Sequence, residues 1–535
     1  MEKRVLIAVV LSIAVMYGYS ILFPPAKQIT AENKSAQTSQ QVDTTASNKV
    51  LKTNELTAQQ VANQVPVNAA NDSDVQVETD NFSVVFSATS GALKKVTLKK
   101  FTDLVGSGAK QVVLHNENAS KGYNLLTDYS GLNLGPMTFT PDRPKLVLSG
   151  DEKKFLEFSA VTSSGAKVVK RYIFSGSGYG ITLENVIKNG TAASIEGTIQ
   201  TVLRSRSAKP KEDAGRYEVF SAASKTESGV TFNTPDDIAK AEKSFSNTVN
   251  WTAFGDKYFL TALIAKDKSI STLNIKSSEG FIEQRVSSPK ITINPGAEIS
   301  VPYEIYIGPK DIDVLKAQNH NLEGVIDLGW FAVIAKPLLH SLKLFYKYLH
   351  NYGLAIIAIT VILKIIFFPL THKSYKSMKE MQKLQPQMQA LKEKFKDDRD
   401  GLNKSVMELY KTHKVNPLGG CLPMVVQIPV FFGLYKALMF SIELRHAPFY
   451  LWIMDLSSRD PYYITPIIMG ITMFIQQKMT PTNMDPVQAK MMLALPVVFT
   501  AMFLNFPSGL VLYWLVNNIL TIAQQMYINK TLKEA

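Results

Sequence analysis

Apolar residues change their spacing several times along this chain, and each change predicts a different kind of structure. Residues 5–23 form a nearly uninterrupted apolar run that is long enough to span a membrane. Lys3 and Arg4 precede the run, and no small-residue cleavage site follows it. We therefore predict an uncleaved signal anchor over residues 1–23 with a cytosolic N-terminus. Residues 24–75 are rich in Gln, Thr, Ala, Asn and Ser, which predicts a flexible tether.

Between residues 76 and 320 the apolar spacing becomes two, which is typical of half-buried strands. In the clearest run, five apolar residues alternate with residues expected to face outward: Ile299, Val301, Tyr303, Ile305 and Ile307 against Ser300, Pro302, Glu304 and Tyr306. Turn signals such as Ser-Gly-Ser-Gly separate the runs. The pattern predicts a large antiparallel β-sandwich, exterior to the cytoplasm because it follows the anchor.

Residues 328–350 show helical spacing. Apolar residues occupy one face and basic residues another: Phe331, Ile334, Leu338, Leu342, Phe345 and Leu349 against Lys336, His340, Lys343 and Lys347. Because Pro337 and three lysines argue against a span, we predict an amphipathic helix in the membrane interface.

The remaining residues, 351–535, contain five apolar segments at about Tyr352–Leu370, Cys421–Ser441, Tyr462–Gln477, Met491–Phe506 and Ser508–Met526. Residues 372–417 carry eleven Lys and Arg against six Asp and Glu, whereas residues 442–461 carry only two basic residues, Arg445 and Arg459. The first loop is therefore expected in the cytosol and the second outside. The fold class predicted is a multi-domain membrane protein with six transmembrane helices, both termini cytosolic, and an exterior β-sandwich.

The basic loop 372–417 has its own helical pattern, with apolar residues at spacings of three and four on either side of a turn at residues 397–401. It predicts a cytosolic helical hairpin whose first arm is kinked at Pro386. Such a hairpin is either a solvated coiled coil or a docking site for a ribosome, a targeting factor or a nascent chain.

Polar residues inside the predicted spans are the candidate chemistry. Lys364 lies in an apolar segment, where a charge costs roughly 2.5 to 3.5 kcal/mol on insertion scales. A polar stripe, Tyr513, Asn517, Thr521 and Gln524, follows one face of the last span. Together they favour a hydrated cavity; the alternatives are hydrogen bonding between helices and a lysine that merely extends to the cytosolic interface.

Composition narrows the function classes. The formal net charge of +13 arises partly from basic loops beside the spans, so it sets topology and does not predict direct nucleic-acid binding. Cys421 is the only cysteine, which excludes an intramolecular disulfide and CxxC metal sites. The β-domain holds His115 but no nucleophile elbow, metal-ligand cluster or phosphate loop. We therefore expect a scaffold or docking domain, no cofactor and no enzymatic activity.

Three segments carry a resemblance to a known family. Asn416-Pro-Leu-Gly-Gly-Cys-Leu-Pro-Met-Val-Val-Gln-Ile-Pro-Val-Phe431, Phe506-Pro-Ser-Gly-Leu-Val-Leu-Tyr-Trp514 and the Pro-Leu-Thr at 369–371 resemble the YidC/Oxa/Alb membrane protein insertase family. With its anchor, tether and β-domain, the chain is similar to the Gram-negative bacterial type. The resemblance implies a five-helix core around a hydrophilic groove open to cytoplasm and lipid, and an exterior β-supersandwich without the activity of the sugar mutarotases it is similar to.

The resemblance also implies site residues. Lys364 takes the position of the groove arginine of the family, with Thr360 and Gln427 beside it, and Tyr513 and Trp514 match contact positions for the entering chain. We add Asn517 from the polar stripe. Lysine lacks the bidentate fork of arginine, so the departure puts a requirement for a guanidinium in doubt.

The function expected is a membrane protein insertase and chaperone of the cell inner membrane. Its expected partners are nascent integral membrane proteins, the lipid bilayer and a Sec translocon, with a ribosome or targeting factor at the hairpin. A lipid scramblase or transporter and a periplasmic scaffold are the alternative functions; the sequence has no convincing internal repeat of the kind seen in many transporters.

Overall fold

The computed structural model describes residues 73–117, 119–207, 220–246, 248–395, 398–413, 415, 422–480 and 486–534. The predicted anchor and nearly all of the predicted tether lie outside these residues. The described residues belong to one compact unit.

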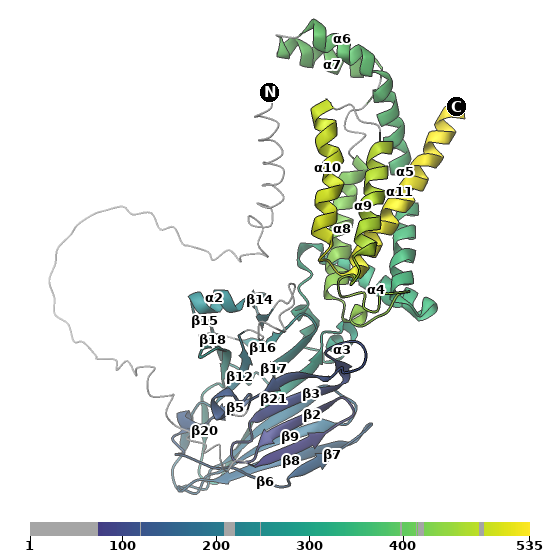
Figure 1. The fold of residues 1–535 in the computed structure, drawn as a ribbon. Helices are drawn as coiled ribbons and strands as arrows, with labels where there is room; N and C mark the ends of the chain where they lie inside the picture. The colour runs from purple at the N-terminus through teal and green to yellow at the C-terminus, as the bar shows by residue number, and fades with distance from the viewer. Residues whose placement is uncertain are drawn as a thin grey trace, which may run out of the picture. The chain divides into compact units, whose positions relative to one another are not determined.

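Strands make up the first part of the described chain (Figure 1). Their bounds are β1 (Asp74–Glu78), β2 (Phe82–Ser87), β3 (Leu93–Thr102), β4 (Gln111–Asn116), β5 (Leu126–Asp128), β6 (Thr140–Pro141), β7 (Lys145–Val147), β8 (Lys153–Val161), β9 (Lys167–Ser175), β10 (Gly180–Lys188), β11 (Ile195–Gly197), β12 (Gln200–Arg206), β13 (Ser221–Thr226), β14 (Gly229–Asn233), β15 (Lys243–Ser246), β16 (Val249–Gly255), β17 (Phe259–Ala265), β18 (Thr272–Ser278), β19 (Phe281–Ser287), β20 (Ile291–Ile293) and β21 (Glu298–Pro309), with α2 (Pro235–Lys240) between β14 and β15. β1 thus begins two residues before the predicted boundary at residue 76.

The largest sheet has nine strands in the order β14-β13-β16-β17-β21-β10-β9-β8-β6. In its centre Leu183 of β10 pairs with Tyr303 of β21 on one side and Tyr172 of β9 on the other, and all three are fully buried. Two five-stranded sheets, β4-β3-β2-β1-β7 and β15-β18-β19-β12-β5, and the pair β11-β20 complete the described domain. The predicted antiparallel β-domain is confirmed, except that the short β7 pairs with β1 in parallel.

Aromatic side chains join two of these sheets face to face. The ring of Phe86 in β2 lies 4.7 Å from that of Tyr172 in β9 and 5.9 Å from that of Phe158 in β8. All three belong to one buried cluster that runs through the domain. The alternating pattern of the sequence therefore forms a core between layers.

Tyr306 corrects one detail of that pattern. The sequence predicts that it faces outward on β21, but it is fully buried. The short helices α3 (Ile312–Ala317) and η5 (Leu322–Val325) cover that face, and Tyr306 packs there with Trp251, Leu315 and Leu322. The sheet is covered on both faces at this end, so period-two burial fails there.

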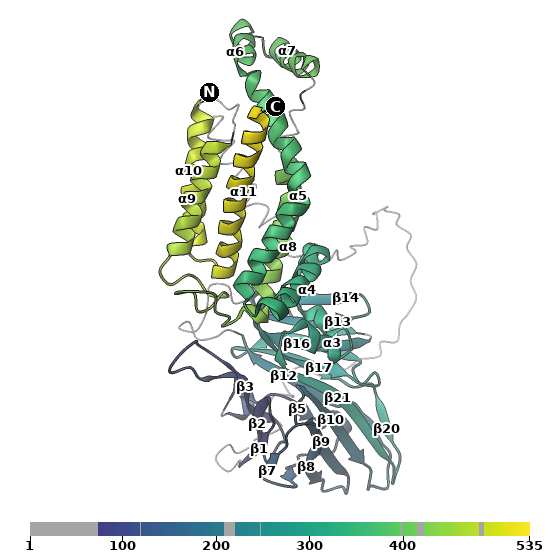
Figure 2. The same ribbon diagram turned by 90° about the vertical axis from the view of Figure 1, so that its right-hand side faces the viewer.

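The rest of the described chain is helical (Figure 2). The bounds are α4 (Ala332–Leu349), α5 (Tyr352–Lys383), α6 (Gln385–Lys394), α7 (Arg399–Thr412), α8 (Leu422–Phe440), α9 (Ile464–Met479), α10 (Pro486–Phe503) and α11 (Ser508–Glu534). α5 and α8 to α11 lie side by side, and α6 and α7 lie beyond the C-terminal end of α5 in both views. α4 buries Leu338, Leu339 and Leu342 and exposes Lys336, His340 and Lys347, as the predicted amphipathic helix requires. Leu349, also predicted for the apolar face, is exposed at the end of the helix.

Two details of the hairpin differ from the sequence prediction. α5 runs unbroken through Pro369 to Lys383, and the chain then breaks at Leu384 with Pro386 as the second residue of α6. A proline there needs no backbone donor, so it begins a new helix instead of kinking an old one. In the predicted turn at 397–401, residues 399–401 are already helical, because Asp398 accepts a hydrogen bond from Gly401 N and caps α7, which begins at Arg399.

By length and composition, α5 is the one helix among the described residues that is apolar enough to cross a membrane. Val426–Phe440 and Met491–Phe503 are shorter apolar helical stretches. The predicted count of six spans therefore stays a prediction.

Candidate functional site

Lys364 lies about three turns into α5. Asn351 caps that helix by accepting a hydrogen bond from Leu354 N at 3.1 Å, which fixes its start. The Lys364 ammonium crosses to α11 and donates a hydrogen bond to the hydroxyl oxygen of Thr521 at 2.6 Å. The side chain is half-buried, and among the described residues no ion pair involves it.

A chain of hydrogen bonds continues from Thr521. Its hydroxyl donates to the carbonyl of Asn517 one turn earlier at 2.6 Å, so its lone pairs are left for the ammonium. The Asn517 side-chain oxygen accepts from the Gln427 amide of α8 at 3.0 Å. Polar groups of α5, α11 and α8 are thereby connected inside an otherwise apolar bundle.

A cavity of about 30 Å³ opens beside these groups. Its lining combines polar and apolar side chains: Thr360, Leu363, Lys364, Phe367, Leu370, Thr371, Gln427, Val430, Tyr513 and Asn517. This is room for about two water molecules, and a water needs the two or more polar partners that this wall offers. We call it the polar cavity.

Five of the six residues predicted from the sequence line the polar cavity: Thr360, Lys364, Gln427, Tyr513 and Asn517. Trp514, the sixth, does not line it. Its ring packs against Phe431 at 4.8 Å and Phe503 at 5.2 Å, in an aromatic cluster of α8, α10 and α11. On one helix, neighbours differ by 100°, so Tyr513 and Trp514 cannot face the same cavity.

Sequence reasoning left Thr521 out of the site, although it placed Thr521 on the polar stripe. It also missed the apolar half of the wall. The signal was available on α5, because Leu363, Phe367 and Thr371 lie three, seven and eleven residues after Thr360 and therefore share its face.

The charge of the polar cavity is positive. A half-buried ammonium held by one neutral hydroxyl keeps donors free for a further acceptor. The hydrogen bond from Lys364 to Thr521 directs the ammonium into the helical bundle. It therefore favours a charge in the cavity over a lysine that extends to the cytosolic interface. Chemically, the site can hold a carboxylate or another polar group in an apolar setting. Its lining residues do not include a nucleophilic side chain next to a general base.

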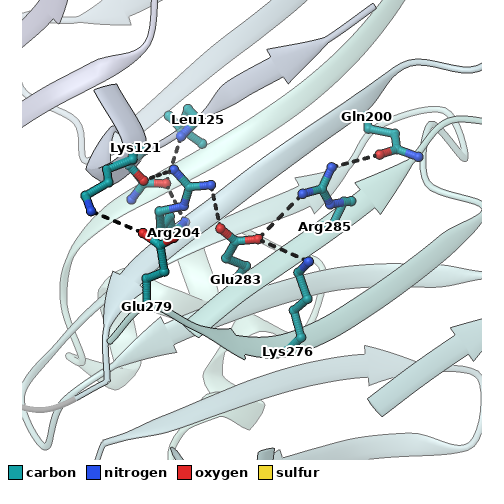
Figure 3. Close-up of polar contacts among 9 residues, drawn as sticks. Lys121, Leu125, Gln200, Arg204, Lys276, Glu279, Glu283 and Arg285 are labelled. Carbon is teal, nitrogen blue, oxygen red and sulfur yellow. Dashed lines mark hydrogen bonds and ion pairs between the residues drawn. The ribbon is translucent and has the colours of Figure 1, made fainter. Parts of the chain in front are cut away.

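The β-domain holds a second set of charged side chains, on the face of β12, β18 and β19 (Figure 3). Glu283 accepts from Arg204 at 2.5 Å, and both side chains are only 10% exposed. Its other oxygen faces Arg285 at 3.5 Å and Lys276 at 4.0 Å. Because Glu283 attracts cations on neighbouring strands, the cluster supports the sheet.

Lys170 of β9 is a fully buried lysine in the same domain. Its ammonium donates to the carbonyls of Gly91 at 3.0 Å, Leu125 at 3.3 Å and Ser90 at 3.4 Å. Burial lowers the pKa of Lys170 to about 7. The lysine joins β9 to two loops and lies away from any cavity that the structure describes, so its role is structural.

Within the described ranges no group of three or more His, Cys, Asp and Glu side chains could hold a metal ion.

Known proteins resemble this chain in sequence over nearly its whole length. Residues 344–535 match the family described as 60Kd inner membrane protein, and residues 74–341 match the YidC periplasmic domain. The membrane protein insertase YidC of Geotalea daltonii is 53% identical over 99% of this chain and 100% of its own, and that of Citrifermentans bemidjiense is 53% identical over 100% of both. A crystal structure of an active YidC insertase covers 85% of this chain and 94% of its own, at 18% identity and a TM-score of 0.37. On the sequence matches, the chain belongs to the YidC family of membrane protein insertases.

Proposed function

We propose that the protein is a membrane protein insertase that moves polar segments of its substrates through the polar cavity. The observation that carries this proposal is the Lys364 ammonium, which is bound to a neutral hydroxyl inside an apolar bundle. A charge in such a place is costly, so it is retained for a function.

The proposed mechanism is electrostatic. An acidic or polar exterior segment of a nascent protein enters the cavity from the cytosol, where Lys364 and the amides of Gln427 and Asn517 replace part of its hydration. At about 4 Å, a lysine and a carboxylate attract each other by roughly 4 kcal/mol at an effective dielectric constant of 20. This supplies a hold on the segment while it crosses.

Release follows from the magnitudes. A substrate span of about 20 apolar residues gains roughly 0.3 to 0.6 kcal/mol per residue in lipid, or about 6 to 12 kcal/mol in total. This exceeds the hold of one charge, so the span leaves for the bilayer and draws its polar segment across. The protein then needs no nucleotide and no metal ion for the step.

In the proposed topology, residues 1–23 and the five helices α5, α8, α9, α10 and α11 span the inner membrane, with both termini in the cytoplasm. The β-domain lies in the periplasm, as a docking or scaffold domain without enzymatic activity. Residues 24–75 are a tether, and α4 lies in the membrane interface. Charge bias between the loops supports this arrangement.

The proposed partners follow from the same arrangement. Nascent integral membrane proteins and lipid contact the polar cavity, and a Sec translocon is expected beside the bundle. α6 and α7 carry the basic loop beyond the end of α5, which supports a role in receiving a ribosome or targeting factor.

The proposal is tested by inserting a small single-span protein with an acidic exterior segment into proteoliposomes. We expect Lys364→Ala to lower the protected fraction, Lys364→Glu to lower it further, and Lys364→Arg to preserve it, because the charge carries the effect. Insertion by the Glu variant at the rate of the parent protein would refute the role of the charge.

Crosslinking from Tyr513 to a stalled nascent membrane protein tests the path itself. A photoreactive residue at position 513 should capture the substrate, and one at 514 should capture it less, because Tyr513 lines the polar cavity and Trp514 does not. Equal capture at both positions, or flipping of lipids by the purified protein without insertion, would favour a different function.

A further inference from the structure

The segment of residues 446–463, between α8 and α9, has its acidic side chains turned inward. Asp455 accepts hydrogen bonds from His446 N at 3.0 Å, from Ser457 N at 2.8 Å and from the hydroxyls of Ser457 and Ser458 at 2.7 Å each. Its carboxylate thus binds groups of its own segment.

Asp460 behaves in the same way and is only 1% exposed. It accepts from Tyr462 N at 2.9 Å and from Thr465 N at 2.8 Å, which caps the beginning of α9. Both aspartates of the segment therefore serve its backbone.

Four large apolar side chains of this segment point outward, whereas Ile453 and Leu456 of the same segment are buried in the helical core. Leu451 is 82% exposed, and Tyr462, Met454 and Tyr450 are 66%, 56% and 55% exposed. We call these four the outward apolar residues. Four large apolar side chains exposed together on one short segment, with both of its carboxylates bound to that same segment, form an unusual surface for a loop in water.

The conformation of the tip is held by the backbone. Phe449 N donates to the Ile453 carbonyl at 2.9 Å, and Ile453 N donates to the Tyr450 carbonyl at 3.2 Å, which closes a turn around Leu451. Leu451 has a φ of 58°, a left-handed conformation that disfavours leucine. Phe449 packs so closely on Gly353 of α5 that a Cβ there would lie 2.1 Å from its ring. The turn thus holds Leu451 in an exposed position, and no other described residue buries its side chain.

The surroundings of the segment identify what covers it. On one side Arg445 donates to the Thr102 carbonyl of β3 and lies 5.3 Å from the ring of Phe259, so that side is occupied by protein. On the other side Tyr462 leads directly into α9, where Ile464, Ile467 and Ile468 are exposed and lipid is the expected neighbour of a span.

We infer that the outward apolar residues insert into the exterior leaflet, at the boundary of lipid headgroups and acyl chains. Tyr450 and Tyr462 have the amphipathic rings typical of this boundary, and the exposed Arg459 can reach lipid phosphates. The inference rests on the proposed topology, in which this segment is exterior. Lipid is the apolar solvent that would bury the outward apolar residues.

The test uses the full chain in vesicles of phosphatidylethanolamine and phosphatidylglycerol at less than one protein per vesicle. Cys421, the only cysteine, is replaced by serine, and an environment-sensitive fluorophore is attached at Leu451→Cys. The matched control is Val161→Cys at the end of β8, an aliphatic residue that is 69% exposed. Lipids with a nitroxide near the headgroup serve as the quencher.

We expect blue-shifted emission at position 451 and quenching severalfold stronger than at position 161. Emission and quenching at 451 equal to those at 161 would overturn the inference. Insertion of a single-span substrate is measured on the same vesicles. If the protein inserts substrate but the probe at 451 is exposed to water, only the lipid contact is refuted. If the probe is quenched but the protein inserts no substrate, the lipid contact is supported and the proposed function is refuted.

Discussion

At the scale of single residues, the position of the Lys364 ammonium depends on one hydroxyl group, that of Thr521. Thr521→Val keeps the shape but removes the acceptor, and a hydrogen bond to a charged group is worth roughly 1.5 kcal/mol or more. We expect insertion of a substrate with an acidic exterior segment to fall by about tenfold in proteoliposomes.

Two variants show whether the hydroxyl itself is responsible. Thr521→Ser restores the acceptor and should restore insertion. Thr531→Val removes a hydroxyl that binds only backbone carbonyls on the same helix, and it should have no effect. If Thr521→Val inserts substrate as well as Thr521→Ser does, the contact has no part in function.

Lys170 makes the stability of the β-domain depend on pH. Its pKa is about 7 in the folded protein and near 10.5 when unfolded, so between these values the unfolded chain binds more protons. Stability should therefore rise with pH over this window, by roughly 2 to 3 kcal/mol between about pH 7 and pH 9.5. Urea unfolding at several pH values measures this slope.

Comparison of the parent protein with Lys170→Met isolates the contribution of Lys170 to the pH dependence of stability, because the other groups titrate equally in both proteins. Burial also lowers the pKa of Lys310, to about 8, so the parent protein keeps some slope from that source. The difference between parent and variant should rise with pH from about 7 and level off above about 10.5. A difference independent of pH would mean that Lys170 has the same pKa in both states.

At the scale of elements, β12 and β19 are joined by the pair of Arg204 and Glu283. Glu283→Gln leaves a mostly buried guanidinium without its counter-charge, and we expect the free energy of unfolding to fall by roughly 2 to 3 kcal/mol. Glu279→Gln is the matched control, because its contact with Lys121 is 68% to 71% exposed and should be worth less than about 0.5 kcal/mol. Equal losses in the two variants would contradict this.

The elements were predictable where one periodicity held throughout. The alternation from Val301 to Ile305 in β21 and the burial of Leu338 and Leu342 in α4 are confirmed, because burial on one side fixes such patterns. The predicted outward orientation of Tyr306 was wrong, because α3 and η5 cover that face of the sheet. The local spacing of apolar residues carries no information about elements that pack on the strand from elsewhere in the chain. The length of α5 was missed for a similar reason: a helix does not end where its apolar residues end.

The polar cavity was predictable to a similar degree. Lys364 and the stripe of α11 stood out because polar groups are rare in spans, and the structure places five of the six predicted residues around one cavity. The partnership of Lys364 with Thr521 was not predictable, since the relative height of two helices is a property of their packing. Trp514 was assigned from family resemblance, and the roles of all six residues stay predictions.

At the scale of the whole molecule, the β-domain should fold without the helices. Its two buried clusters draw on residues before 327, with the single exception of Ile442, whereas the helical residues from Leu328 onward form their own. A fragment of residues 73–327 should therefore give a cooperative thermal transition in water, followed by circular dichroism.

The position of the C-terminal end of that fragment should affect its stability. Stopping at Pro309 removes α3 and η5 and uncovers Trp251 and Tyr306, so we expect lower stability and red-shifted tryptophan emission. If the fragment of residues 73–309 is as stable as the longer one, α3 and η5 belong to the linker and not to the domain.

The hydrogen bond of Lys364 to a neutral partner, Thr521, also bears on the energy of the protein without substrate. Within the described residues no acidic group offsets this charge, so the empty state carries an electrostatic cost that a bound carboxylate would relieve. If cargo binds in the polar cavity as we propose, the empty protein is the state of higher electrostatic energy. Each carboxylate cargo would then lower this energy on entry and restore it on departure, so a cycle without fuel would return to its own starting point.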